Sequence, residues 1–81
     1  MIELTLIGKP GCHLCDDAEA VIDGVLAELE LQITVDKKNI LDDEALFARY
    51  SEEIPVLLIN GKVHNYWHID PERLRSALAE L

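Results

Sequence analysis

The feature that most constrains the fold of this chain is a pair of cysteines, Cys12 and Cys15, placed where an apolar run ends and a helical pattern begins. Residues 2–7 are mostly apolar, which predicts a short buried strand, and the glycines and proline within residues 8–11 predict a loop after it. Beyond this loop, apolar residues recur at steps of three and four, which predicts a helix over 12–29 with one buried face. The residues of that face are Leu14, Ala18, Val21, Ile22, Val25 and Leu29.

The middle of the chain predicts a second strand and a second helix. Apolar and polar residues alternate over 31–36, so a strand with one more polar face is expected there. The acidic stretch 42–44 provides an N-cap and first-turn carboxylates for a short helix that ends near Ser51. Within the first helix, close packing against the sheet would account for Gly24. The residues expected to face inward from the second helix are Leu46, Phe47 and Tyr50.

The last third of the chain predicts a hairpin and a third helix. Residues 56–59 are continuously apolar, and Asn60-Gly61 after them is typical of a type I′ turn, so residues 62–67 should pair back antiparallel. Asp70-Pro71-Glu72 then reads as N-cap, first helical position and first-turn acid. Its inward residues are Leu74, Ala77, Leu78 and Leu81. The element order is therefore βαβαββα, in one α/β domain over 1–81.

Composition and charge exclude several classes of function. The formal net charge is −9, from 16 acidic and 7 basic residues, which argues against binding to nucleic acids or to acidic membranes. The N-terminal residues 1–5 carry an acid where a signal peptide would carry a base, and no apolar run is long enough to span a bilayer. Two cysteines are too few for the disulfide framework of a small secreted domain. A cytoplasmic monomer is the expectation.

The cysteine pair predicts thiol-disulfide exchange. At the start of a helix, free backbone N–H groups and the helix dipole favour a thiolate, so Cys12 is the candidate nucleophile. Cys15 lies one turn further in and can resolve a mixed disulfide formed by Cys12. A protonated His13 would add positive charge beside Cys12, whereas Asp16 and Asp17 oppose a further anion, so the balance stays open.

The cysteine pair has three other interpretations: a zinc site, two inert buried thiols and a structural disulfide. A structural zinc site needs four ligands, and His64 and His68 lie beyond the predicted hairpin turn without a second cysteine pair. Two inert buried cysteines fit poorly with a loop–helix junction that brings Cys12 near the surface. A purely structural disulfide would close a very short loop and constrain little of the unfolded chain. We therefore expect no metal at this pair.

Residues 9–15 (KPGCHLC), Tyr50 and residues 54–57 (IPVL) before a hairpin together resemble the glutaredoxins and their small bacterial glutaredoxin-like relatives. The resemblance covers the whole chain and implies a thioredoxin-like fold, with a four-stranded mixed sheet flanked by three helices. It also implies a cis Pro55 facing the cysteines, where the backbone of Ile54 can pair with an incoming peptide or glutathione. An ordinary proline that begins a strand is the other interpretation of Pro55.

The same resemblance implies the substrate-binding residues. A lysine three residues before the nucleophile helps to hold glutathione in the family, and Lys9 fills that place. The predicted substrate-binding residues are Lys9, Gly11, His13, Ile54 and Pro55. The chain departs from the family at residues 64–70, where bulky residues replace a Gly-Gly pair, and at His13-Leu14, where Pro-Tyr is common. Glutathione specificity and the direction of the reaction therefore stay open.

The aromatic stretch after the hairpin has two interpretations. Strand alternation favours a core position for Trp67, whereas a platform for a partner beside the cysteines is the functional alternative. His68 is expected at the surface or as a cap. The predicted function is a glutaredoxin-like thiol-disulfide oxidoreductase that acts on a disulfide-containing protein or a glutathione mixed disulfide, with glutathione as a possible co-substrate and no bound cofactor. The alternatives are a non-catalytic interaction domain and a metal or iron–sulfur carrier.

Overall fold

The computed structural model describes residues 2–80, and its strands and helices follow the predicted order βαβαββα. The strands form one mixed sheet in the order β2-β1-β3-β4, in which β1 is parallel to β2 and antiparallel to β3, and β3 is antiparallel to β4. Leu81, predicted to be the last apolar residue of the third helix, lies outside the described residues, as does Met1. The elements are β1 (Leu4–Gly8), α1 (His13–Glu28), β2 (Val35–Asn39), a 3-10 turn (Ile40–Asp42), α2 (Glu44–Tyr50), β3 (Val56–Ile59), β4 (Lys62–Tyr66) and α3 (Pro71–Ala79).

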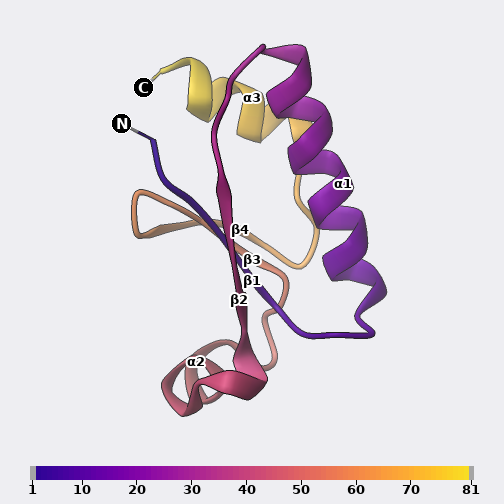
Figure 1. Cartoon of the computed structure of the whole chain (residues 1–81), viewed down its shortest axis with the longest axis vertical. Helices are drawn as coiled ribbons and strands as arrows, with labels where there is room; N and C mark the ends of the chain where they lie inside the picture. Colours follow the sequence, from indigo (N-terminus) through magenta and orange to yellow (C-terminus); the bar gives the residue numbers. More distant parts are fainter. Residues whose placement is uncertain (1, 81) are drawn as a thin grey trace.

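The sheet buries apolar side chains on both faces, because successive residues of its central strands point to opposite sides. Figure 1 shows α1 and α3 next to each other on one side of the strands, with α2 at the lower end of the view. Leu6 and its cross-strand partner Leu57 face α1 and α3, whereas the neighbouring pair Ile7 and Val56 belongs to a second cluster with α2. The larger cluster is formed by Leu4, Leu6, Ala18, Ile22, Val25, Leu26, Leu57, Ile69, Leu74 and Leu78.

The second strand lies further along the chain than its alternating pattern predicted. Residues 31–34 lie outside the helices and strands, and β2 begins at Val35, which pairs with Leu4 at the start of β1. Leu31, Ile33 and Val35 are half-buried against the larger cluster, so the alternating pattern does correspond to one apolar side of this segment. The ladder itself continues through Lys37 and Lys38, because β2 is an edge strand that needs no apolar face of its own.

Several predicted side-chain positions are wrong. Leu14, Phe47 and Trp67 are 37%, 49% and 51% exposed, so none of them is a core residue. On α1 the buried face begins with Cys15 instead of Leu14, because Cys15 is in phase with Ala18 and Ile22. Gly24 does not contact the sheet, since a Cβ there would meet no atom within 4 Å outside the local helix backbone.

The hairpin turn has the predicted conformation. Asn60 and Gly61 both have positive φ, 51° and 83°, as a type I′ turn requires. The Asn60 side chain also accepts a hydrogen bond from the Glu3 backbone N–H at 2.8 Å, which ties the turn to the start of the chain. Further along the hairpin, the pairing of β3 with β4 skips His64, so this residue forms a bulge.

The described residues contain no membrane-spanning helix. None of the helices within residues 2–80 is long and apolar enough to cross a bilayer.

Candidate functional site

Cys12 caps the first helix with its own sulfur. It is the N-cap of α1, and its Sγ accepts a hydrogen bond from the Cys15 backbone N–H over 3.1 Å. This N–H is one of the donors that the first turn of any helix leaves without a backbone partner. The Cys12 side chain is partly exposed, and both cysteines are free thiols. The geometry therefore holds the Cys12 sulfur at the N-terminus of α1, in contact with one of its free N–H groups.

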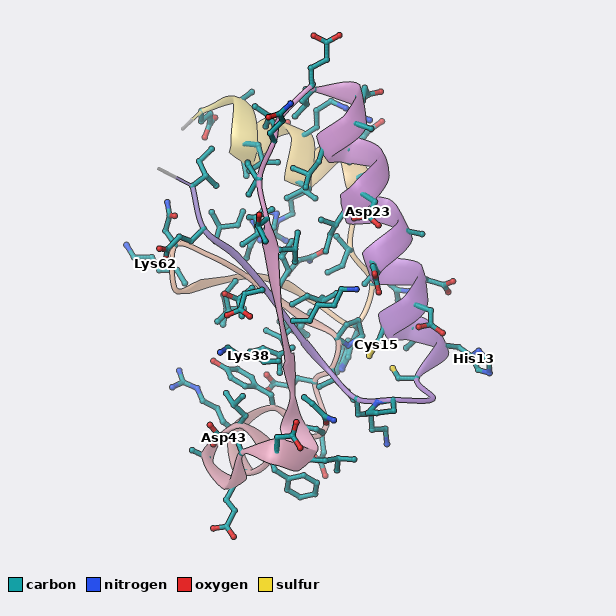
Figure 2. All side chains as sticks on the ribbon, in the orientation of Figure 1. His13, Cys15, Asp23, Lys38, Asp43 and Lys62 are labelled. Atoms are coloured by element: carbon teal, nitrogen blue, oxygen red, sulfur yellow. The ribbon has the colours of Figure 1, made fainter. Side chains whose placement is uncertain are left out.

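Cys15 packs closely against Gly8 at the end of β1. It is 8% exposed and lies on the sheet-facing side of α1 (Figure 2). A Cβ placed on Gly8 would lie only 2.7 Å from Cys15 Sγ, a separation that real side chains do not adopt. Gly8 is thus required by the second cysteine, and sequence reasoning missed it. Its only signal was a glycine at the point where β1 ends.

The environment of Cys15 favours the protonated thiol. Burial is the largest cause that raises the pKa of Cys15 from 9.0 to about 11, and a side-chain hydrogen bond with Cys12 adds to the rise. Charge repulsion from Cys12 and from the Asp16 carboxylate acts in the same direction, whereas a backbone hydrogen bond from Lys9 lowers the pKa. Below the alkaline range, Cys15 therefore keeps its proton.

The other residues predicted around the cysteines lie in the loop or at the first turn of α1. Gly11 has a φ of 76°, which explains a glycine immediately before Cys12. The Lys9 side chain is exposed, while its backbone contacts the Cys15 sulfur. His13 is the first residue of α1 and is directed away from the body of the protein in Figure 2. Of these three, Lys9 alone combines a backbone contact with Cys15 and an exposed charge.

A shallow hollow of about 260 Å³ adjoins Cys15 on the β2 side. Lysines 9, 37 and 38 line it, but Lys37 forms an ion pair with Glu19, and Lys38 forms one with Asp36. The structure therefore places Lys9 and Cys15 in a common hollow that does not include Cys12, His13, Ile54 or Pro55. The full lining is Leu6, Gly8, Lys9, Pro10, Cys15, Asp16, Glu19, Lys37, Lys38 and Asn39.

Ile54 and Pro55 directly precede β3, which lies on the side of β1 opposite to β2. Ile7 of β1 pairs with Val56 of β3, and continuing this register by one residue places Pro55 next to Gly8. The Ile54–Pro55 peptide bond is cis, and the Pro55 side chain is less than 2% exposed. Ile54, by contrast, is half-buried.

The histidines of the C-terminal third take no part in this arrangement. His68 is exposed, as expected, and His64 lies within β4 with its Nε2 atom buried. Burial, and then the charge of Arg73, lower the pKa of His64 below its ordinary value. Among residues 2–80, no three side chains of the metal-binding types gather closely enough to hold a metal ion.

Comparison with known proteins gives a consistent picture. The family described as Glutaredoxin-like domain (DUF836) matches residues 3–79. The uncharacterized protein Rv0508 of Mycobacterium tuberculosis is 29% identical over 80 residues, which cover 95% of this chain and 82% of that protein.

Solved structures resemble the fold over nearly its whole length. The X-ray structure of the structural genomics target XcR50 from X. campestris is 32% identical, with a TM-score of 0.71 over 96% of this chain and 97% of that one. The solution structure of Ne2328 from Nitrosomonas europaea is 23% identical, with a TM-score of 0.79 over 94% and 89%. A thioredoxin-2 described as a component of the malaria parasite protein secretion machinery is 16% identical, with a TM-score of 0.68 over 100% and 84%, which shows a shared thioredoxin fold.

Proposed function

Because this chain belongs to the glutaredoxin-like domain family, we propose that it is a thiol-disulfide oxidoreductase in which Cys12 is the nucleophile and Cys15 the resolving thiol. The observation that carries the proposal is the asymmetry of the pair. Cys12 is partly exposed, and its sulfur accepts a hydrogen bond from an N–H group at the helix start. Cys15 is buried and holds its proton. An attacking thiolate needs the first environment, and a thiol that waits inside the protein suits the second.

The reaction proceeds in two exchanges. The Cys12 thiolate attacks one sulfur of a substrate disulfide, forms a mixed disulfide with that sulfur, and releases the other half of the substrate as a thiolate. Cys15 then gives up its proton, to the released thiolate or to water, and attacks the Cys12 sulfur. This step forms the Cys12–Cys15 disulfide and releases the second half of the substrate as a thiolate. Two electrons pass from the protein to the substrate, and an external thiol reductant must return them.

The first exchange prepares the second. Once Cys12 is part of a mixed disulfide, its charge and its side-chain hydrogen bond no longer raise the pKa of Cys15. Burial still raises this pKa, but two of the causes have gone, so the pKa falls and Cys15 becomes a better nucleophile at neutral pH. In this proposal, Cys15 stays protonated until Cys12 forms a mixed disulfide with the substrate.

Glutathione is a candidate reductant and co-substrate in this proposal. The exposed Lys9 ammonium lies in the loop before Cys12 and adjoins the hollow beside Cys15, where a carboxylate of a small thiol peptide could bind. A disulfide-containing protein is the alternative substrate, and it would pair with the backbone of Ile54.

The decisive experiment follows thiol release from two mixed disulfides, one of glutathione and one of a peptide, with the reduced protein and with two variants. Cys12→Ser should remove the reaction, because it removes the attacking sulfur. Cys15→Ser should leave the first exchange intact and accumulate a mixed disulfide that intact-mass measurement detects. If Cys12→Ser reacts like the natural chain, or if the natural chain releases no thiol, the proposal is wrong and a non-catalytic domain is the better explanation.

A further inference from the structure

Trp67 has a backbone conformation that is unusual for a bulky residue. It follows β4 directly, and its φ is 64°, in the left-handed region that favours glycine. The residue is also 51% exposed, so burial of the indole accounts for only part of its placement. A residue held in a costly conformation and left half in solvent needs a further reason for its presence.

Trp67 makes two hydrogen bonds to the loop that precedes β3. Its backbone N–H donates to the Pro55 carbonyl at 2.8 Å, and its indole Nε1–H donates to the Glu52 carbonyl at 3.0 Å. Only Glu53 and Ile54 lie between these two carbonyls. One tryptophan therefore holds both ends of the short segment that contains Ile54.

The backbone of Ile54 itself is free. Among residues 2–80, the hydrogen bonds of loops, turns and caps include neither its N–H nor its C=O, and Ile54 lies outside the strands and helices. Its side chain packs against the second cluster, which fixes the residue without using its polar backbone groups. The buried residues of that cluster are Ile7, Ile40, Tyr50 and Val56. A free N–H and C=O on a residue that is anchored by its side chain can pair with an extended chain.

We infer that Trp67 is a positioning residue for peptide substrates, holding the segment from Glu52 to Pro55 so that the Ile54 backbone receives an extended peptide whose disulfide meets Cys12. The inference rests on the proposed function. The indole also packs edge-on with the Tyr66 ring, with centroids 5.0 Å apart and an interplanar angle of 79°. A disulfide without a peptide backbone gains nothing from this arrangement.

The test compares two substrates with the same leaving group. One is a short peptide whose cysteine is disulfide-linked to thionitrobenzoate, and the other is mercaptoethanol linked to the same chromophore. Attack by Cys12 on the peptide or mercaptoethanol sulfur releases coloured thionitrobenzoate from both, so the ratio of the two rate constants isolates the contribution of the peptide backbone. Trp67→Phe removes the indole hydrogen bond and keeps an aromatic ring, and Phe47→Leu changes an exposed aromatic on α2 as the matched control.

We expect Trp67→Phe to slow the reaction with the peptide about three- to tenfold, which is the usual worth of one hydrogen bond, through a higher KM. The rate with the mercaptoethanol substrate should stay the same, and Phe47→Leu should change neither rate. Trp67→Gly relaxes the backbone and removes the ring, so it should lower the peptide rate at least as far. It serves as the second variant if Trp67→Phe folds poorly.

The outcomes separate this inference from the function beneath it. If the natural chain releases thionitrobenzoate and neither Trp67 variant changes the ratio of the two rate constants, Trp67 is merely structural and the inference is overturned while the function stands. If the natural chain reacts with neither substrate, both are overturned. An independent readout uses Trp67 as the one tryptophan of the chain. In a Cys12→Ser background, a reduced peptide should change its fluorescence, and an unchanged spectrum at saturating peptide counts against the inference.

Discussion

The two sides of the candidate site are built in different ways. The dithiol corner, residues 8–15, is held by contacts among residues close in sequence, such as the bond from the Cys15 N–H to Cys12 three positions earlier. The clamped loop, residues 52–55, is held by Trp67, fifteen positions from Glu52 along the chain. The corner contains the two thiols to which the proposed function assigns the reaction, whereas the clamped loop contains the backbone to which it assigns peptide binding. The position of the two thiols at the helix start is therefore encoded locally, whereas the burial of Cys15 and the clamped loop depend on the tertiary fold.

The largest expected effect tests how tightly the corner is packed. Gly8→Ala would bring a Cβ within 2.7 Å of Cys15 Sγ, so the sulfur or the strand must shift. We expect a loss of about 3 kcal/mol in the free energy of unfolding, the upper part of the range for overpacking. Denaturant unfolding measures it. Gly24→Ala is the matched control, since it meets no such contact and should stabilise its helix by about 1 kcal/mol. Equal effects of the two variants would show that the corner has room to adjust.

The next effect concerns alkaline pH, to which the corner should respond and the clamped loop should not. The folded protein holds the Cys15 proton up to a pKa of about 11, whereas the unfolded chain loses it near 9.0. The folded state therefore binds more protons in this window, and its stability is complete below pH 9 and falls as pH rises towards 11. The full shift corresponds to about 3 kcal/mol, and we expect about 2 kcal/mol after screening by solvent.

Unfolding free energies measured between pH 9 and 11 for the natural chain and for Cys15→Ala test this expectation. Because lysines and tyrosines also titrate there, the informative quantity is the difference between the two slopes. The Cys15→Ala profile should be flatter. Parallel profiles would mean that burial of Cys15 does not control its proton.

A smaller effect tests the turn that carries Trp67. The Asn65 side chain accepts a hydrogen bond from the Asp70 backbone N–H at 3.0 Å and so closes the turn around Trp67. Asn65→Ala should cost about 1 kcal/mol, the usual value for one such bond. A double-mutant cycle with Trp67→Phe should give a coupling of about 0.5 kcal/mol or more, because both residues hold the same turn. Additive effects would mean that the turn and the clamp are independent.

The smallest effect separates the charges within the corner. The Asp16 carboxylate is the last of the causes that raise the pKa of Cys15, so Asp16→Asn should lower this pKa slightly. Asp17→Asn is the control, since Asp17 is not among those causes. Thiolate absorbance in a Cys12→Ser background reports Cys15 alone. A rise in its pKa with Asp16→Asn would contradict the assigned direction.

Most of the fold follows from local patterns in the sequence. Helical spacing located α1 and α3, Asn60-Gly61 located the hairpin, and Asp70-Pro71 located the start of α3. The prediction failed where tertiary position outweighs pattern. The strand β2 was placed too early because an edge strand of lysines carries little apolar signal. Trp67 was placed in the core because alternation does not reveal that the chain leaves the strand in a left-handed turn.

What the sequence determined by itself was the placement of the cysteine pair, because the two cysteines lie within one turn of helix after one short loop. The pair Cys12 and Cys15 at a loop–helix junction predicted an N-terminal sulfur and a second thiol further in, and the structure has both. Only the tertiary structure decided that Gly8 must make room for Cys15 and that Trp67 must hold the loop around Ile54. These contacts join separate elements, and their geometry depends on sheet register and on how helix and strand pack, which residue spacing does not specify.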